Sequence, residues 1–249
     1  MNHKVFVAGA SGAIGQRLVP LLCSAGHKVV GTTRTEQGAE TLRALGSEAV
    51  IVDVFDAEAL SRAVLAVQPK IIIHQLTGLS AWEAGCIEEA ITENARVRTE
   101  GTRNLVKAAL AAATRRLIAQ SIAWVYASGA LPHKETDPLD VEAQGTTAVT
   151  VSGVMALESA VLNSPPLEGV VLRYGQFYGP GTGHESPAGT SPIHVDAAAY
   201  AALLAIDHGA LGSVFNIAEP NEFVATEKAR GELGRHADFR LSMEKLPDL

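Results

Sequence analysis

The sequence predicts an α/β fold in which helices cover both faces of a mostly parallel sheet. Short apolar runs without polar alternation recur along the chain, as expected for strands that are buried on both faces. Amphipathic helical stretches separate these runs, and this alternation favours right-handed crossovers between parallel strands. With 249 residues, the chain is long enough for one large domain. Ligands of such folds bind beyond the carboxyl ends of the strands.

The predicted elements follow one another in a regular order. The strands are Lys4–Ala8, Val29–Thr33, Ala49–Val52, Ile71–His74, Leu117–Gln120, Gly169–Tyr174 and Val214–Ile217. The helices are Ala13–Ala25, Glu36–Leu45, Ala57–Val67, Glu88–Ala112, Ala148–Leu162 and Val195–Asp207. Polar stretches with glycine or proline, at 131–147 and 179–192, are predicted as loops over the site. We expect a single domain over 1–249, with a core of about 1–163 and a small substrate lobe of about 164–249.

The composition limits the possible partners. The net charge is −7 and the chain has no long basic run, which argues against nucleic acid as a partner. The N-terminus lacks the pattern of a signal peptide, and no apolar run is expected to span a membrane. The two cysteines, Cys23 and Cys86, have the spacing of neither a metal site nor a disulfide framework. We therefore expect a cytoplasmic protein without a metal.

Three glycines connect the first strand to the first helix in Gly9-Ala-Ser-Gly-Ala-Ile-Gly15. Gly9 would let the chain leave the strand sharply, Gly12 would let the backbone approach a pyrophosphate, and Gly15 would allow close packing of helix on strand. The spacing, G-x-x-G-x-x-G, differs from the G-x-G-x-x-G fingerprint. The helix N-terminus would present free N–H groups and the positive end of its dipole to phosphates. The order of strand, glycine turn and helix therefore predicts a Rossmann-type dinucleotide site.

The end of the second strand indicates which nucleotide is bound. NAD-binding folds of this type usually have Asp or Glu there for the ribose 2′-hydroxyl, whereas this chain has Thr32-Thr33-Arg34. A guanidinium binds a phosphate with two hydrogen bonds, and an acid would repel it. We therefore predict NADP(H), with Arg34 on the 2′-phosphate and Thr32 or Thr33 assisting. Glu36 lies close by and leaves NAD(H) open. Asp53, after the third strand, either caps a helix or accepts from the adenine amino group.

Further motifs follow in order along the chain. They are Asp53-Val54, Ile71-Ile-Ile-His74, Gly101-Thr-Arg-Asn-Leu105, Val125-Tyr126, Leu172-Arg-Tyr-Gly-Gln-Phe-Tyr-Gly-Pro-Gly181 and Pro192-Ile-His-Val-Asp196. Together with the glycine motif, they resemble the extended short-chain dehydrogenase/reductases, in the NAD-dependent epimerase/dehydratase branch. The resemblance runs from Val5 to about Arg230. It implies a Rossmann domain, a bound nicotinamide cofactor and a small C-terminal substrate lobe.

The resemblance also implies which residues line the site. Besides Thr33 and Arg34, the implied cofactor contacts are Gly9, Ser11, Gly12, Ile14, Gly15, Asp53, Val54, Gln75, Leu76, Thr77 and Ser121. Gln176 and Phe177 would line the pocket for the nicotinamide and the substrate. Trp124 and Phe177 could shape an apolar substrate pocket or simply pack in the core, and Tyr178 could reach the substrate from a glycine-rich loop.

The residues that carry the family's chemistry are missing. That chemistry uses a tyrosine as acid/base, a lysine four residues later that lowers the tyrosine pKa, and a Ser or Thr near the fifth strand. Aligned on Glu158, the tyrosine position is Thr150 and the lysine position is Val154. No tyrosine occurs between positions 126 and 174, and no lysine between positions 134 and 228. The usual proton relay cannot operate in this chain.

Three explanations of the missing pair remain open. Another residue supplies the proton, or the reaction needs only hydride transfer with a proton from substrate or water, or the protein binds the cofactor without catalysis. Ser121 and Tyr126, near the carboxyl end of the fifth strand, are the candidate catalytic residues. Tyr126 could instead be a packed aromatic residue with a satisfied hydroxyl.

Other polar residues have simple alternative roles. His74 ends the fourth strand, where a hydrogen-bonded core histidine is the preferred interpretation. His194 and Asp196 start a helix, so capping is the simplest role for Asp196. Arg98, on the predicted helix 88–112, is either a solvated surface charge or a ligand for a phosphate or a substrate carboxylate.

The sequence thus predicts an NADP(H)-binding oxidoreductase that transfers a hydride to or from a small carbonyl or alcohol substrate. One alternative is a sugar-nucleotide epimerase or dehydratase, which needs proton removal as well as hydride transfer and more room than the short C-terminal lobe offers. Another is a non-catalytic regulator that senses NADP(H). The resemblance also implies a homodimer through the long helices.

Overall fold

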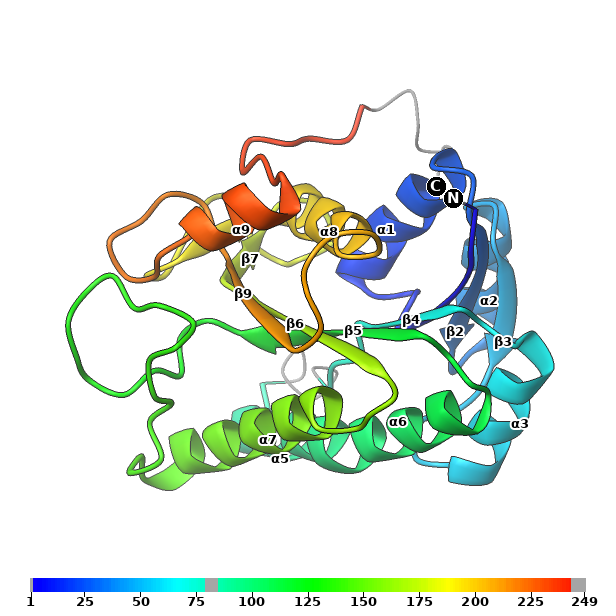
Figure 1. Cartoon of the computed structure of the whole chain (residues 1–249), viewed down its shortest axis with the longest axis horizontal. Helices are drawn as coiled ribbons and strands as arrows, with labels where there is room; N and C mark the ends of the chain where they lie inside the picture. The colour runs from blue at the N-terminus through cyan, green and yellow to red at the C-terminus, as the bar shows by residue number, and fades with distance from the viewer. Residues whose placement is uncertain (1, 79–84, 243–249) are drawn as a thin grey trace.

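The structure is a computed structural model that describes residues 2–78 and 85–242. Within these residues, seven parallel strands form one sheet in the order β3-β2-β1-β4-β5-β6-β9 (Figure 1). The order reverses between β1 and β4, and such a switch point opens a crevice at the carboxyl ends of the two strands. The strands are β1 (Lys4–Ala8), β2 (Lys28–Thr33), β3 (Glu48–Ile51), β4 (Ile71–His74), β5 (Arg116–Ile122), β6 (Glu168–Tyr174) and β9 (Ser213–Ile217).

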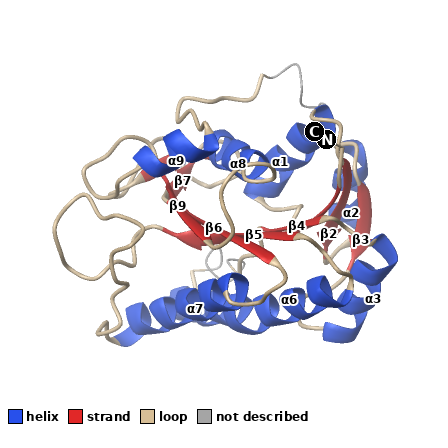
Figure 2. Cartoon of the chain, viewed as in Figure 1, coloured by secondary structure: helices blue, strands red, loops and turns tan. Residues whose placement is uncertain are grey.

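Helices form a layer on each face of this sheet, as Figure 2 shows. One layer contains α1 (Ala13–Ser24), α8 (Val195–Leu204) and α9 (Glu227–Leu233), and Leu42 of α2 (Glu36–Ala44) packs into the same core. The other contains α3 (Ala57–Val67), α5 (Ile87–Arg96), α6 (Thr102–Ala111) and α7 (Gly145–Leu162).

The side chains of β1 explain why both faces of the sheet are covered. Val5 and Val7 belong to the core on the α1 and α8 side, whereas Phe6 and Ala8 belong to the core on the α3 and α6 side. Alternate residues of a strand point to opposite faces, so an apolar run without polar alternation requires two covering layers. The predicted α/β fold with a doubly wound, mostly parallel sheet is confirmed.

Most predicted elements are present with ends shifted by a few residues, and three differences matter for the site. The predicted helix 88–112 is interrupted by a π-helical turn, η1 (Val97–Gly101), between α5 and α6. Two short strands that were not expected, β7 (Gln176–Tyr178) and β8 (Pro192–His194), pair in parallel at the two ends of the predicted loop 179–192. Helix α9 was not predicted either.

Helix α7 also corrects the expectation that no apolar run could span a membrane. By length and composition alone, its eighteen residues pass that test. In the structure, Leu157 and Val161 pack in the core beneath the sheet, so the apolar residues of α7 are accounted for in part by packing within the protein.

The C-terminal part of the chain contributes to the main sheet. β6 pairs with β5 and β9 pairs with β6, so both strands extend the same sheet. β7 follows the carboxyl end of β6 and pairs with β8, whereas α9 packs in the helix layer on one face of the sheet. The boundary near residue 163 between a core and a substrate lobe stays a prediction.

Candidate cofactor and reaction site

A crevice of about 190 Å³ opens at the carboxyl ends of β1 to β4. Its lining brings together most of the residues that the sequence implied for the cofactor, including Thr33 and Arg34 from the end of β2 and Gln75 from the end of β4. The full lining is Gly9, Ser11, Gly12, Thr33, Arg34, Val52, Asp53, Val54, Phe55, Gln75, Leu76, Thr77, Glu93 and Val97. Of the implied cofactor contacts, Ile14, Gly15 and Ser121 do not line it.

The three glycines of the first turn differ in why glycine is needed at each position. Gly9 has a φ of +84°, and a Cβ there would lie 2.6 Å from the carbonyl oxygen of Gln75. A Cβ on Gly15 would collide with the backbone of Ala10. Gly12 has a φ of −79°, and its nearest neighbour, the carbonyl oxygen of Gly9, would lie at an ordinary 3.5 Å. Nothing within the described protein requires glycine at position 12, which leaves room for a ligand against the exposed backbone.

The N-terminus of α1 is open to an anion. Gly12 is its N-cap, no side chain caps the helix, and its first turn carries no acidic residue. Its first backbone N–H groups and the positive end of its dipole therefore remain available for phosphate oxygens. The end of β2 supports the turn, because Gly9 N–H donates to Thr32 Oγ1 at 3.2 Å and Ser11 Oγ lies 3.3 Å from Thr33 Oγ1. These residues fit a dinucleotide diphosphate.

The end of the crevice beside β2 carries a cation, Arg34, with which no described residue pairs. Arg34 is exposed and makes no ion pair or side-chain hydrogen bond with the described residues. Glu36 begins α2 and does not line the crevice. Asp53 Oδ1 accepts from Phe55 N–H at 2.9 Å, and the cap of α3 is Asp56, which accepts from Ala59 N–H at 2.9 Å. Asp53 is therefore not needed as a helix cap.

Sequence reasoning missed four residues of the lining, namely Val52, Phe55, Glu93 and Val97. Phe55 is held by Arg96 of α5, whose guanidinium carbon lies 3.9 Å from the ring centroid. No local sequence signal marks this contact, because the two residues come from different elements that only the fold brings together.

The end of β4 is fixed by a buried histidine. His74 is fully buried, its Nε2 lies 2.9 Å from Thr102 Oγ1, and its Nδ1 accepts from Leu76 N–H at 3.2 Å. Burial, with the charge of Arg98 adding to it, lowers the pKa of His74 to about 4. A neutral histidine with both nitrogens hydrogen-bonded agrees with the core interpretation.

The two candidate catalytic hydroxyls lie in a buried polar network. Ser121 Oγ donates to Glu158 Oε1 at 2.7 Å, and the same carboxylate receives Arg173 Nε at 2.9 Å and Nη2 at 2.7 Å. Arg173 Nη1 also donates to the hydroxyl of Tyr126 at 2.9 Å, which in turn donates to Asn216 Oδ1 at 2.6 Å. The network therefore links β5, α7, β6 and β9.

This network directs both hydroxyl protons toward protein acceptors. Ser121 is 1% exposed and Tyr126 is 7% exposed. Burial raises the pKa of Tyr126, although the charge of Arg173 opposes that effect. Whether either hydroxyl also serves a substrate stays a prediction.

Apolar side chains surround the position of the missing lysine. Val154 is fully buried in a cluster with Ile122, Val125 and Val151. Thr150, at the tyrosine position one turn earlier on α7, is half-buried. The part of α7 that faces β5 therefore carries neither a cation nor a phenol before Glu158.

The predicted substrate residues differ in their contacts and in their exposure to solvent. Gln176 Oε1 accepts from the N–H and the hydroxyl of Ser191, at 3.0 and 3.1 Å. Phe177 packs on Tyr174 with ring centroids 5.4 Å apart. Tyr178 is buried, donates to Glu219 Oε1 at 2.6 Å and accepts from Arg240. Trp124 is 38% exposed in the segment after β5.

The start of α8 corrects one prediction. The cap is His194, whose Nδ1 accepts from the N–H of Asp196 at 3.2 Å. Asp196 lies in the first turn, where its Oδ2 accepts from Leu241 N–H at 3.1 Å. The capping role predicted for Asp196 is wrong, because its buried carboxylate binds the C-terminal segment instead.

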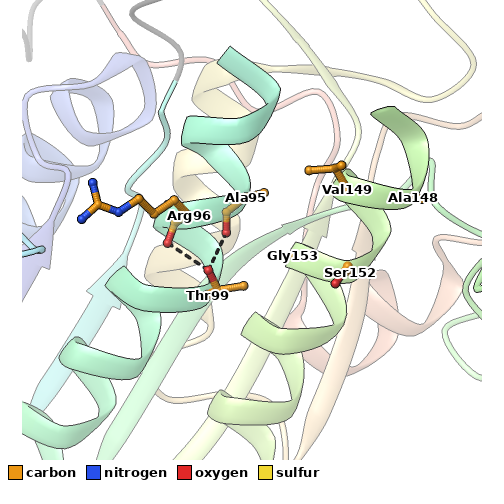
Figure 3. Close-up of a pocket in the computed structure, with 7 residues that line it drawn as sticks. All are labelled: Ala95, Arg96, Thr99, Ala148, Val149, Ser152 and Gly153. Carbon is orange, nitrogen blue, oxygen red and sulfur yellow. Dashed lines mark hydrogen bonds between the residues drawn. The ribbon is translucent and has the colours of Figure 1, made fainter. Parts of the chain in front are cut away.

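A second, open groove of about 430 Å³ lies between α5 and α7 (Figure 3). The two helices approach closely at Gly153 of α7, which has no Cβ. A Cβ at this position would lie only 3.1 Å from the Cα of Ala95 on α5. Thr99 turns its hydroxyl back onto its own helix, to the carbonyl oxygens of Ala95 and Arg96. The predicted homodimer would use these helices, and it stays a prediction.

Comparisons with known proteins agree with this geometry. The model of the NAD dependent epimerase/dehydratase family matches residues 5–200. A 3-diazoavenalumate denitrifying reductase from a Streptomyces species is 40% identical over 230 residues, which cover 84% of this chain and 74% of the relative.

Solved structures show the same fold. The UDP-glucose 4-epimerase of Thermotoga maritima is 20% identical, with a TM-score of 0.75 over 98% of this chain and 96% of that chain. The dTDP-glucose 4,6-dehydratase DesIV of Streptomyces venezuelae, solved with NAD, is 16% identical, with a TM-score of 0.75 over 98% and 94%. The fold, the glycine turn and the matching family model lead to one conclusion: the chain belongs to the NAD dependent epimerase/dehydratase family.

Proposed function

We propose that the chain is an NADP(H)-dependent reductase whose reaction takes no proton from a protein acid. The observation that carries this proposal is the apolar surrounding of Val154, at the position where the family's chemistry needs a lysine. Without a cation beside it, a phenol has no lowered pKa, and the phenol itself is replaced by Thr150. Hydride transfer to a positioned substrate needs neither group.

The cofactor part of the proposal rests on the crevice. The open N-terminus of α1 would hold the diphosphate, and the carboxyl ends of β2 and β3 would hold the adenosine. Arg34 supports NADP(H) over NAD(H), because it is a free guanidinium at the end of a strand that carries no acid. When bound in reduced form, the nicotinamide supplies a hydride.

A diazo group on an aromatic ring is the substrate class that fits best. The relative of 40% identity is named for a diazo compound and for a reduction that removes nitrogen. Reduction of the diazonium form makes one C–H bond from a hydride and breaks the C–N bond. Dinitrogen leaves with the electron pair of that bond, so atoms and charge balance without a proton. A site that lacks an acid/base pair is sufficient for this chemistry.

The remaining site residues then have binding and positioning roles. Ser121, Tyr126 and Glu158 are linked through Arg173 beside the ends of β5 and β6, at the edge of the sheet where ligands of such folds bind. The exposed ring of Trp124 is available to stack on an aromatic substrate. Epimerase or dehydratase activity is less well supported, because both reactions need the proton transfer for which this site lacks the usual residues.

Turnover assays test this function. We expect the purified protein to oxidise NADPH in the presence of an arenediazonium or an ortho-quinone diazide, with release of dinitrogen and of the reduced arene. We expect little oxidation with a panel of ketones and aldehydes. Spontaneous reduction is measured without protein and with Gly12→Val, which should block the diphosphate site. NADPH binding with no turnover of any substrate would contradict the proposal and favour a non-catalytic sensor of NADP(H).

A further inference from the structure

Arg98 is a buried arginine without a close partner among residues 2–78 and 85–242. It is 8% exposed, and it makes no hydrogen bond or ion pair with the residues that the structure describes. Burying an unpaired charge costs several kcal/mol, and buried charges in proteins are almost always paired. The expectation of a solvated surface charge is therefore wrong.

Arg98 lies next to the cofactor crevice and near the buried polar network. It lies in the π-helical turn η1, immediately after Val97, which lines the cofactor crevice. Thr102 follows η1 and its hydroxyl contacts His74 at the end of β4. Beyond the effect of burial, the charge of Arg98 lowers the pKa of His74, and Glu158 of α7 attracts the guanidinium. Single π-helical turns of this kind occur frequently at functional sites.

The charges around Arg98 do not cancel. Glu158 is already held by two hydrogen bonds from Arg173 and one from Ser121, and it forms a close ion pair with Arg173. Two guanidiniums therefore share one carboxylate. Burial lowers the pKa of Arg98 to about 10, so it remains charged at neutral pH. One further negative charge would complete the cluster.

We infer that Arg98 binds a carboxylate of the substrate at the reaction site. A guanidinium matches a carboxylate with two parallel hydrogen bonds, and this pairing is strongest where water is excluded. The relative of 40% identity is named for the anion of an acid, which agrees with this chemistry. The inference rests on the proposed function because it names the substrate class for the same site: an aromatic diazo compound with a carboxylate side group.

Binding of inert ligands tests Arg98 without turnover. Calorimetry with the NADP⁺-loaded protein compares cinnamate with cinnamamide, which have nearly the same shape and differ in charge. We expect the wild type to bind cinnamate at least about tenfold more tightly, and Arg98→Gln to lose this preference while it keeps its affinity for the amide and for NADP⁺. Arg103→Gln removes an exposed charge from the next turn and should keep the preference.

Several results would overturn the assignment. They are equal affinity of the wild type for both ligands, an unchanged preference in folded Arg98→Gln, or a loss of NADP⁺ affinity in that variant. If Arg98→Gln does not fold, Arg98→Lys decides, because it keeps the charge without the two-pronged guanidinium. The cinnamate preference should then fall several-fold, and an unchanged preference would contradict the pairing. A protein that prefers cinnamate but reduces no diazo compound would refute the proposed reaction alone.

Discussion

At the scale of single residues, this site is defined by which polar groups are satisfied and which are free. His74, Ser121 and Tyr126 all have hydrogen-bond partners inside the protein. Arg34 and Arg98 have no close partner among the described residues, and they lie on different parts of the site. Satisfied groups hold a structure in place, whereas free cations are suited to bind anions. The two arginines therefore carry the binding specificity in our account.

Arg34 tests the choice of cofactor. We expect Arg34→Ala to weaken NADPH binding by about 1–3 kcal/mol, the usual value of a hydrogen bond to a charged group, and to leave NADH binding nearly unchanged. Calorimetry with both cofactors measures the difference. Equal losses of affinity for both cofactors would contradict the assignment of Arg34 to the 2′-phosphate.

His74 makes stability depend on pH in a defined direction. Its pKa is lowered from about 6.5 to about 4, so the unfolded chain takes up the proton first as the pH falls. Its contribution is complete above pH 6.5 and is lost as the pH falls toward 4, by at most about 3 kcal/mol. Urea unfolding at a series of pH values, for the wild type and for His74→Gln, measures the contribution of His74 to the free energy of unfolding. Parallel pH profiles of the two proteins would show that the histidine is not held neutral.

A variant at Tyr126 tests whether its hydroxyl has a structural or a catalytic role. We expect Tyr126→Phe to lower the free energy of unfolding by about 1–3 kcal/mol, because Arg173 and Asn216 lose a buried partner. Turnover of the folded variant should stay within a few-fold of the wild type. A loss of several hundred-fold in turnover, with unchanged substrate affinity, would make this phenol the proton donor after all.

At the scale of elements, the connection from β1 to α1 combines fold and function in seven residues. Gly9 and Gly15 are required by contacts inside the protein, with Gln75 and Ala10 respectively. Gly12 has no such contact and an ordinary negative φ. The sequence pattern predicts a turn at Gly9 and close packing at Gly15, which agrees with these contacts, whereas the family resemblance counts all three glycines as cofactor contacts. Gly9 and Gly12 line the crevice, and Gly15 does not.

This difference can be measured with two alanine variants. We expect Gly12→Ala to change the free energy of unfolding by less than about 1 kcal/mol and to weaken NADPH binding at least about tenfold. Gly15→Ala should lower stability by about 1–3 kcal/mol, because its methyl group has no space beside Ala10. Thermal melts and cofactor titrations give both values. Normal NADPH affinity in Gly12→Ala would mean that the backbone there does not approach the cofactor.

Some elements could be predicted from the sequence and others could not. Long apolar strands and amphipathic helices were predicted because their periodicity is local. The turn η1 was predicted as plain helix, since a single π turn has no periodicity of its own. Strands β7 and β8 have three residues each and pair across a long loop, so no local pattern marks them. The charges that act on Arg98 and on which it acts, Glu158 of α7 and His74 of β4, are remote from it in sequence.

At the scale of the whole molecule, the cofactor crevice and the buried polar network lie on different halves of the sheet. Strands β1 to β4 carry the crevice for the cofactor, and β5, β6 and β9 carry the polar network beside the segments assigned to the substrate. The order of strands follows from local patterns and from the rules for parallel crossovers. The network of Ser121, Glu158, Arg173 and Tyr126 could not be predicted, because its members come from four segments and only the packed fold brings them together.

Isotope transfer tests the central claim, that a hydride alone reduces the substrate, most directly. NADPH that carries deuterium at one face of nicotinamide C4 is supplied with an aryl diazo carboxylate in ordinary water, and the product is analysed by mass spectrometry. We expect one deuterium in the arene from only one of the two C4 diastereomers, with one dinitrogen released for each NADPH oxidised. A product whose new hydrogen comes from water, or deuterium transfer without preference for either face, would contradict the account.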